Sequence, residues 1–248
     1  MEKDRRLEYI EYALEKVGFV KVDELQKKLK VSDMTIRRDL NELEKKGKAI
    51  RTHGGARSLA VKPIFEMSHT DKSVINLDKK EEIAKLASSI INSLDSEIIF
   101  LGPGTTIEML AKLISNKSLT IVTNSLPVFI TLSNMDMDIY LLGGKIRTIT
   151  QSFNGDITND SLYNMKFHRM FFSCNAISEN DVMTSTISEA STQRIALKNS
   201  AKKYLLADSS KFGKSDFISF ASADELDYII TNKENGNKHI INSYNNIL

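Results

Sequence analysis

A short amphipathic helix is predicted by the stretch Val31-Ser-Asp-Met-Thr-Ile-Arg-Arg-Asp-Leu40 and by the Asn41-Glu-Leu-Glu-Lys-Lys-Gly47 that follows it. At about 100° per residue, Ile36, Leu40 and Leu43 fall on one face, and an apolar stripe of this kind must be buried. Ser32 is suited to cap the first turn, because its hydroxyl can accept a hydrogen bond from a backbone N–H without a partner in the helix. Gly47 is expected to end the helix.

The opposite face of this helix is polar and basic. It carries Met34, Arg38, Asn41 and Lys45, flanked by Thr35 and Arg37. Side chains of these types contact base edges and phosphates when a helix lies in a DNA groove. Such a face is also common on helices that meet only solvent, so the surrounding sequence has to distinguish the two interpretations.

The sequence on either side of this helix favours DNA binding. Apolar residues keep helical spacing from Leu7 to Val17, and a second short helix is expected from about Asp23 to Leu29. Three helices in about 45 residues suit a helix-turn-helix. In 48–57, two alternating stretches flank a Gly-Gly pair that can turn tightly with positive φ, which predicts a basic wing.

Charge is distributed unevenly along the chain. Residues 1–62 contain 16 Lys and Arg against 11 Asp and Glu, whereas residues 63–248 contain 18 against 21. The first part therefore carries a formal net charge of +5 and the second −3. This asymmetry is typical of a head that binds phosphates and a body that does not.

The helix and wing together resemble the signature of the DeoR family of transcriptional regulators. The resemblance lies in Ser32-Asp-Met-Thr-Ile-Arg-Arg-Asp-Leu40, Gly47, Arg51 and His53-Gly-Gly-Ala56. It implies a winged helix-turn-helix head that binds double-stranded operator DNA, joined to a body that senses a sugar phosphate. The residues expected at the DNA are Ser32, Met34, Thr35, Arg37, Arg38, Asn41, Lys45, Lys48, Arg51, His53 and Arg57.

At 248 residues, the chain is long enough for a small head and one larger domain. The expected boundaries are 1–58 for the head, 59–77 for a linker that loses periodicity, and 78–234 for the effector domain. Residues 235–248 are expected to be an Asn-rich C-terminal tail, loose at its end.

Composition excludes several classes of protein. Cys174 is the single cysteine, so no internal disulfide framework is expected, and nothing at Met1 resembles a signal segment. No apolar stretch approaches the roughly 20 residues that span a bilayer, so we expect a cytoplasmic protein. The four histidines are scattered without the spacing of a metal site, and we expect neither a metal nor a cofactor.

Helical and strand-like stretches alternate from Asp78 onward. Helices are expected at 78–93, 106–114 and from 126, and strands at 98–101, 119–123 and 139–142, with more strands at 170–172, 204–207 and 228–231. Apolar, β-branched strands separated by helices indicate a mostly parallel sheet covered on both faces. The body is therefore predicted to be a Rossmann-like α/β domain.

Ligands in such a sheet bind at the carboxyl ends of the strands. Four small, polar segments follow predicted strands here, at 102–106, 124–125, 143–145 and 208–211. The first opens a helix, so backbone N–H groups and two hydroxyls can surround a phosphate there. The residues expected at the effector are Gly102, Gly104, Thr105, Thr106, Asn124, Ser125, Gly143, Gly144, Lys145, Asn175, Glu189, Asp208 and Lys211.

The body also resembles the DeoR family, whose effector domains are similar to ribose-phosphate and glucosamine-phosphate isomerase folds. The segments Gly102-Pro-Gly-Thr-Thr106, Phe172-Ser-Cys-Asn-Ala-Ile177 and Val182-Met-Thr-Ser-Thr186 resemble one branch of the family. That branch regulates lactose utilisation in Gram-positive bacteria, and the resemblance implies repression relieved by tagatose 6-phosphate. A symmetric homo-oligomer is expected at the operator.

Two other functions remain open from the sequence. The body can be a working phosphosugar isomerase with a DNA-binding appendage, which needs a carboxylate base in the pocket. Residues 173–176 carry no carboxylate, and Glu189 is the remaining pocket acid, although it fits a helix surface or first turn equally well. A nonspecific architectural or RNA-binding module fits less well, because the head lacks surface aromatics for base stacking.

Overall fold

The computed structural model describes residues 3–17, 19–52, 54–58, 67–232 and 244–248. The chain divides into two compact units, Met1–Phe65 and Glu66–Leu248. Part of the stretch expected to be a linker is helical and belongs to the larger unit: α4 spans His69–Ser73, and α5 (Leu77–Asn92) begins at Leu77. No helix among the described residues combines the length and apolar character that crossing a bilayer requires.

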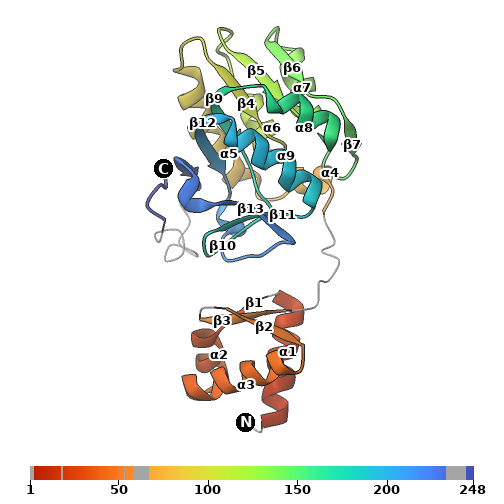
Figure 1. Ribbon diagram of the computed structural model, residues 1–248. Helices are drawn as coiled ribbons and strands as arrows, with labels where there is room; N and C mark the ends of the chain where they lie inside the picture. Colours follow the sequence, from red (N-terminus) through yellow and green to blue (C-terminus); the bar gives the residue numbers. More distant parts are fainter. Residues whose placement is uncertain (1–2, 18, 53, 59–66, 233–243) are drawn as a thin grey trace. The chain divides into compact units, whose positions relative to one another are not determined.

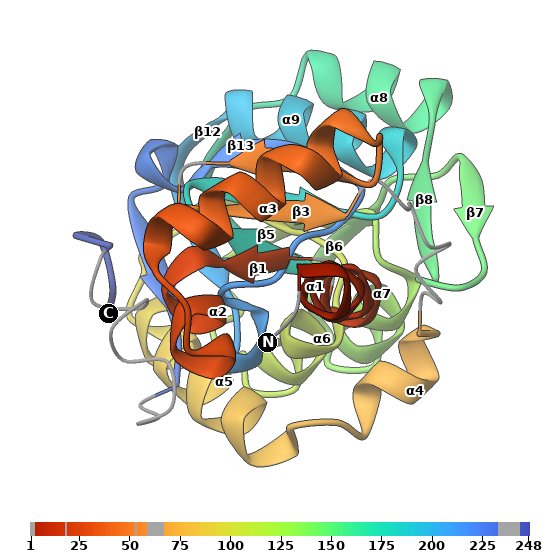
Figure 2. The same ribbon diagram turned by 90° about the horizontal axis from the view of Figure 1, so that it is seen from below.

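The smaller unit is a winged helix-turn-helix (Figures 1 and 2). Its helices are α1 (Lys3–Val17), α2 (Val22–Leu29) and α3 (Asp33–Lys45). Strands β1 (Phe19–Lys21), β2 (Ala49–Thr52) and β3 (Gly55–Ser58) form an antiparallel sheet in the order β1-β3-β2. In the hairpin of β2 and β3, Thr52 pairs with Gly55, and Gly54 takes a φ of +85°, which glycine adopts without a steric penalty.

Helix α3 forms as its sequence predicts. Ser32 takes an extended backbone conformation, and its Oγ accepts a hydrogen bond from the Thr35 N–H at 3.3 Å. Ile36, Leu40 and Leu43 are fully buried in a core shared with α1 and α2. Gly47 follows the helix with a φ of +66°, so the chain turns there into β2.

A buried ion pair joins α1 to α3. Asp39 is 2% exposed and Arg6 8%. The guanidinium donates from Nη2 to Asp39 Oδ1 at 3.1 Å and from Nε to Oδ2. The hydrogen bond with Asp39 raises the pKa of Arg6, so the guanidinium stays charged. This pair was not anticipated, because the acidic residue lies next to the apolar stripe of α3 and its partner is 33 positions away.

The larger unit is built on six parallel strands in the order β14-β12-β9-β4-β5-β6. They are β4 (Ile98–Leu101), β5 (Thr120–Thr123), β6 (Asp138–Leu141), β9 (Phe167–Phe172), β12 (Ser200–Leu206) and β14 (Tyr228–Ile230). Each corresponds to a predicted strand. From β4 the chain proceeds to β5 and β6 on one side and to β9, β12 and β14 on the other.

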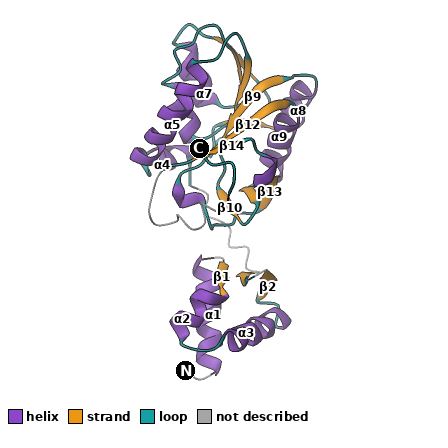
Figure 3. Ribbon diagram, turned by 90° about the vertical axis from the view of Figure 1, so that its left-hand side faces the viewer, coloured by secondary structure: helices purple, strands orange, loops and turns teal. Residues whose placement is uncertain are grey.

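Helices cover both faces of this sheet (Figure 3). On one face, α5, α6 (Thr105–Ala111) and α7 (Leu126–Ser133) pack on residues such as Ile99, Leu101 and Phe171. On the other, α8 (Asp156–Tyr163) and α9 (Ile187–Lys198) pack on residues such as Phe100 and Phe172. Successive strand residues point to opposite faces, so both cores draw on the same strands.

Two smaller sheets were not anticipated. Strands β10 (Ala176–Ser178), β11 (Asp181–Thr184) and β13 (Ile218–Ser222) form an antiparallel sheet in that order. Strands β7 (Lys145–Arg147) and β8 (Ser152–Asn154) form a hairpin. Two short 3-10 helices, Ser209–Lys211 and Ala223–Glu225, follow β12 and β13. All of these elements are three to five residues long, too short to establish a hydrophobic period.

The end of the C-terminal segment is packed, contrary to the loose tail expected from its composition. The Leu248 N–H donates to Ile229 O at 2.9 Å, and the Ile229 N–H donates to Asn246 O at 2.8 Å. Tyr244 meets Phe212 edge-on with ring centroids 5.7 Å apart. The asparagine composition suggested disorder, but an aromatic ring at 244 and an isoleucine at 247 supply apolar contacts that hold the segment.

Candidate functional site

The outer face of α3 presents the residues expected to read DNA. Met34 is 72% exposed, and Arg38, Asn41 and Lys45 are also exposed. They recur at helical spacing opposite the buried stripe of Ile36, Leu40 and Leu43. The structure therefore brings these four side chains together on one surface of the head.

Several of the other residues expected at the DNA make contacts within the head. Arg37 pairs within the helix with Asp33, Nε to Oδ1 2.5 Å, and Lys48 Nζ contacts both carboxylate oxygens of Glu11 at 2.8 Å. Arg51 donates from Nη1 to the Arg37 carbonyl at 3.2 Å, which ties the wing to α3. Ser32 caps the helix with Thr35 beside it, Arg57 is exposed on β3, and His53 lies outside the described residues.

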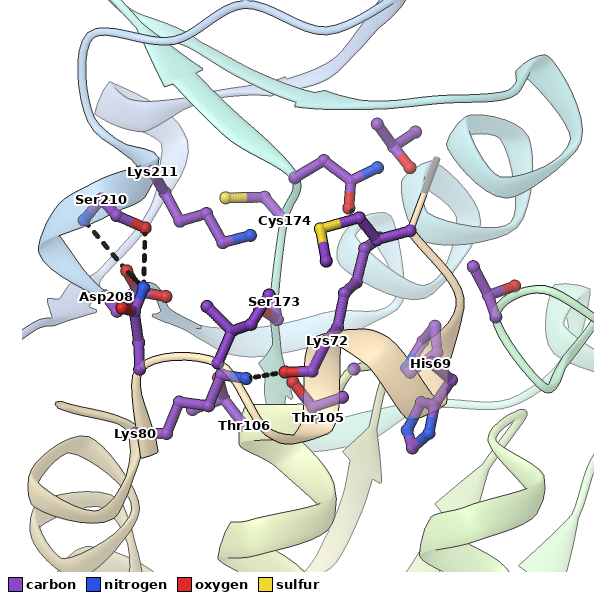
Figure 4. A pocket seen from close by; sticks show the side chains of 18 of the residues that line it. His69, Lys72, Lys80, Thr105, Thr106, Ser173, Cys174, Asp208, Ser210 and Lys211 are labelled. Carbon is purple, nitrogen blue, oxygen red and sulfur yellow. Dashed lines mark hydrogen bonds between the residues drawn. The ribbon is translucent and has the colours of Figure 1, made fainter. Parts of the chain in front are cut away.

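The larger unit contains a cavity of about 210 Å³ at the carboxyl ends of three adjacent strands, β12, β9 and β4. The chain order reverses between β9 and β4, and ligands of open α/β sheets bind at such a switch point. Gly104, Thr105 and Thr106 follow β4, residues 173–175 follow β9, and residues 208–211 follow β12. Helices α4, α5 and α9 contribute further residues to the wall, together with the loops beside them (Figure 4).

Four lysines line this cavity: Lys72 on α4, Lys80 on α5, Lys211 and Lys214. Lys72 donates to Asn175 Oδ1 at 3.1 Å, and Lys80 donates to the backbone carbonyl of Lys72. Lys80 is only 5% exposed, and burial lowers its pKa, with Lys211 and Lys72 acting in the same direction and Asp208 opposing them. Figure 4 shows Lys211 extending into the cavity and Lys80 directed at the Lys72 carbonyl.

Asp208 and Glu189 are the carboxylates among the described cavity residues, and each is held by hydrogen bonds. Asp208 Oδ1 accepts from the Ser210 N–H at 2.9 Å and from Asn76 Nδ2 at 3.2 Å. Glu189 is 5% exposed and lies in the first turn of α9, where the Thr186 hydroxyl accepts a hydrogen bond from its N–H at 3.2 Å. Its carboxylate accepts from Arg147, Thr150, Thr184, Ser185 and Thr186 at 3.0–3.4 Å.

His69 closes the side of the cavity formed by α4. The backbone N–H of His69 donates to Ile149 O at 2.7 Å, and the ring Nε2 lies 3.4 Å from Glu108 Oε2. Burial lowers its pKa, and the nearby carboxylate opposes that shift. A neutral ring therefore lies beside the basic groups of the cavity.

Seven of the thirteen residues expected at the effector line the cavity: Gly104, Thr105, Thr106, Asn175, Glu189, Asp208 and Lys211. Gly102 lies behind it, with its N–H bonded to Phe171 O at 2.9 Å. Asn124 and Ser125 are buried after β5, and Lys145 is exposed on β7. Gly143 accepts from Thr158 Oγ1 at 2.7 Å, and Gly144 packs against that residue with a φ of +138°. The structure does not bring these six to the cavity wall.

Sequence reasoning missed three of the four lysines, Lys72, Lys80 and Lys214. Lys72 belongs to α4, which is too short to show a period and lies in a stretch interpreted as a linker. Lys80 had a usable signal: it lies three residues before Ile83 and four before Ala84, on the buried stripe of α5. A lysine at a core-facing helical position is rarely buried unless it is paired or serves a site.

Metal and thiol chemistry find no support among the described residues. They contain no group of three or more His, Cys, Asp or Glu placed to hold a metal ion. Cys174 lines the cavity, and burial raises its pKa to about 12. The thiol stays protonated at neutral pH and is a poor nucleophile.

Both units match known family models. The model described as a DeoR-like helix-turn-helix domain matches residues 6–61, and the model described as the DeoR C terminal sensor domain matches residues 75–233. These two ranges cover most of the chain and correspond to the two units of the structure.

Curated relatives match over nearly the full length. The lactose phosphotransferase system repressor of Streptococcus mutans serotype c is 47% identical over 241 residues, which cover 96% of this chain and 95% of the relative. The protein of the same name from Staphylococcus aureus (strain NCTC 8325 / PS 47) is 44% identical over the same shares of each chain.

Solved structures are more distant. Ribose 5-phosphate isomerase A from Methanocaldococcus jannaschii matches 55% of each chain at 16% identity with a TM-score of 0.40. The translation initiation factor eIF-2B of Pyrococcus horikoshii matches 92% of this chain and 80% of its own at 12% identity with a TM-score of 0.43. With identities of 16% and 12% and TM-scores of 0.40 and 0.43, these similarities are too weak to indicate a function.

Proposed function

Since this chain belongs to the DeoR family of transcriptional regulators, we propose that it represses a sugar-utilisation operon and that a sugar phosphate relieves the repression. The observation that supports the ligand most is the cavity with Lys72, Lys80, Lys211 and Lys214 in its wall. Relatives at 44–47% identity are named lactose phosphotransferase system repressors, which supports a role in lactose or galactose utilisation. Tagatose 6-phosphate, the ligand that the family resemblance implies, is our first candidate.

The charges and polar groups of the cavity suit a phosphorylated carbohydrate. Among the described lining residues, four lysines oppose the two carboxylates of Asp208 and Glu189, so the cavity favours an anion. The hydroxyls of Thr105, Thr106 and Ser210 can bond phosphate oxygens. The buried Lys80 carries a desolvation penalty that a bound phosphate would offset, because an opposite charge stabilises the charged form.

The proposed DNA interface is the exposed face of α3 with the wing. Arg38, Met34, Thr35 and Asn41 would read the major groove, and Arg37, Lys45, Lys48 and Arg51 would hold phosphates without reading sequence. Ser32 would act as the helix cap, and Arg57 would reach the backbone from β3. A symmetric homo-oligomer would place two heads on matching half-sites.

Helix α4 suits a role in coupling the two activities. It is the first described element after β3 along the chain, and it supplies Lys72 and His69 to the cavity. Three hydrogen bonds hold α4 in its position. Lys72 donates to Asn175 Oδ1, Lys80 donates to the Lys72 carbonyl, and the backbone N–H of His69 donates to Ile149 O. A bound phosphate that replaces the hydrogen-bond partners of Lys72 and Lys80 would change the position of α4. If this change lowers the affinity for DNA, bound DNA must lower the affinity for the phosphate by the same factor.

The enzyme alternative is disfavoured by the state of the cavity carboxylates. An isomerase base needs a free carboxylate within reach of the carbon-bound proton. Glu189 accepts hydrogen bonds from five side chains, and Asp208 accepts from Asn76 and the Ser210 N–H. We therefore propose a regulator rather than an enzyme, as the names of the relatives also indicate.

Thermal unfolding tests the proposal together with a turnover assay. The protein is heated with tagatose 6-phosphate, galactose 6-phosphate, fructose 1-phosphate or inorganic phosphate, and each mixture is checked for isomerised product. At least one sugar phosphate is expected to raise the melting temperature without being converted, because a ligand that binds only the folded state stabilises it by mass action. Turnover would favour the enzyme, and no shift with any sugar phosphate would contradict the proposed ligand class.

A further inference from the structure

Gln193 lies in the cavity wall and carries a hydrogen-bonding group that no described residue pairs with. It lies on α9, lines the cavity and is 7% exposed. Its side-chain oxygen Oε1 is buried and has no hydrogen-bond partner among the described residues. A buried acceptor of this kind is costly in an empty site, so its occurrence in a cavity wall points to a ligand that supplies the donor.

Other polar groups on the same wall are already engaged. The carboxylate of Glu189, one turn earlier on α9, accepts hydrogen bonds from five side chains. His69 Nε2 also lacks a hydrogen bond, but it faces the carboxylate of Glu108 at 3.4 Å. Among the described side chains of the wall, Gln193 therefore has unused accepting capacity.

The amide of Gln193 lies close to the end of β4. A Cβ atom added at Gly102 would lie 3.5 Å from Gln193 Nε2 and 3.1 Å from Phe172 Cβ. Because Gly102 has no side chain, its backbone packs directly against the side-chain amide of Gln193. A side chain confined by packing offers its acceptor in one place, as a group that selects among ligands must.

We propose that Gln193 is a specificity-determining residue whose Oε1 accepts a hydrogen bond from a hydroxyl of the carbohydrate, while the lysines hold the phosphate. This inference rests on the proposed function of the cavity and assigns recognition of the sugar and binding of the phosphate to different residues. A site built to pair a hydroxyl rejects analogues that lack it, because its buried polar group is left unpaired.

The test compares Gln193→Met with Gln26→Met, which makes the same chemical change on α2 of the head. Calorimetric affinities of both variants and the wild type are measured for the three sugar phosphates named above and for inorganic phosphate. Gln193→Met is expected to weaken the best-binding sugar phosphate about tenfold and to leave inorganic phosphate within roughly twofold of wild type. Gln26→Met is expected to match wild type for all four.

Other outcomes would contradict either the role of Gln193 or the proposed ligand class. Unchanged sugar-phosphate affinity in Gln193→Met, or an equal loss for inorganic phosphate, would overturn the role of Gln193 while leaving the proposed ligand class intact. A wild-type protein that binds none of the sugar phosphates would overturn the proposed function and the inference with it.

A second measurement does not depend on the folding of the variant. Analogues of the best-binding sugar phosphate, each lacking one hydroxyl, are titrated into the wild-type protein. One analogue is expected to lose about tenfold in affinity. Equal affinities across the series would overturn the proposal.

Discussion

The ion pair between Arg6 and Asp39 allows a quantitative prediction for the DNA-binding head. Asp39→Ala leaves a guanidinium that is 8% exposed without its carboxylate. Removing one partner of a buried pair costs about 3–5 kcal/mol, because the remaining charge stays desolvated. For a unit of this size, 3 kcal/mol corresponds to a fall in melting temperature on the order of 12–24 °C.

The assay is differential scanning calorimetry of the full chain, with DNA binding measured on the same samples. The head of Asp39→Ala is expected to unfold first, with loss of DNA binding, while the larger unit keeps its transition and its response to sugar phosphate. The double variant Arg6→Met with Asp39→Leu is the control. It is expected to recover most of the stability, since apolar residues of similar volume replace buried pairs without penalty.

Two outcomes would contradict a buried, desolvated ion pair between Arg6 and Asp39. If Asp39→Ala melts within about 1 °C of the wild type, the pair is not desolvated in solution as the structure has it. If the double variant is as unstable as the single one, the loss comes from packing rather than from an unpaired charge.

Three further predictions concern the two sites. Arg38→Ala is expected to weaken operator binding by about 1–3 kcal/mol and to relax base preference, whereas Lys45→Ala is expected to lower affinity similarly for all sequences. Gel shifts at fixed salt distinguish the two variants. If both bind DNA as the wild type does, this face of α3 does not belong to the interface. Lys211→Ala is expected to keep operator binding but to lower sugar-phosphate affinity by about 1.5–3 kcal/mol, measured by calorimetry, and an unchanged affinity would remove the lysine from the site. Gly144→Ala is expected to destabilise the larger unit in thermal melts, because its Cβ would lie 2.3 Å from Thr158 Oγ1 at a φ of +138°, and a wild-type melt would show that the loop can give way.

Regular elements with a clear hydrophobic period could be predicted from the sequence. The face of α3, its cap at Ser32 and the strands of the parallel sheet follow from apolar spacing and from a hydroxyl in the right place. Local chemistry suffices for these features, because each depends on residues within a few positions of one another.

Features that depend on distant partners could not be predicted. Glycines 143 and 144 resemble a ligand loop in sequence, but in the structure they pack against Thr158 of α8. Lys72 reaches the cavity because α4 is held by the Ile149 carbonyl, a contact that joins segments 80 residues apart. The tightly packed C-terminal residues likewise depend on β14 and not on their own composition.

We propose that ligand binding in the larger unit controls DNA binding by the head. It is tested most directly by selecting a preferred duplex from pooled oligonucleotides and then titrating sugar phosphate into the protein–duplex complex while fluorescence anisotropy reports binding. The account predicts a steep sequence preference and release of the duplex by a sugar phosphate at concentrations where inorganic phosphate has no effect. Unchanged anisotropy with a sugar phosphate already shown to raise the melting temperature would contradict it.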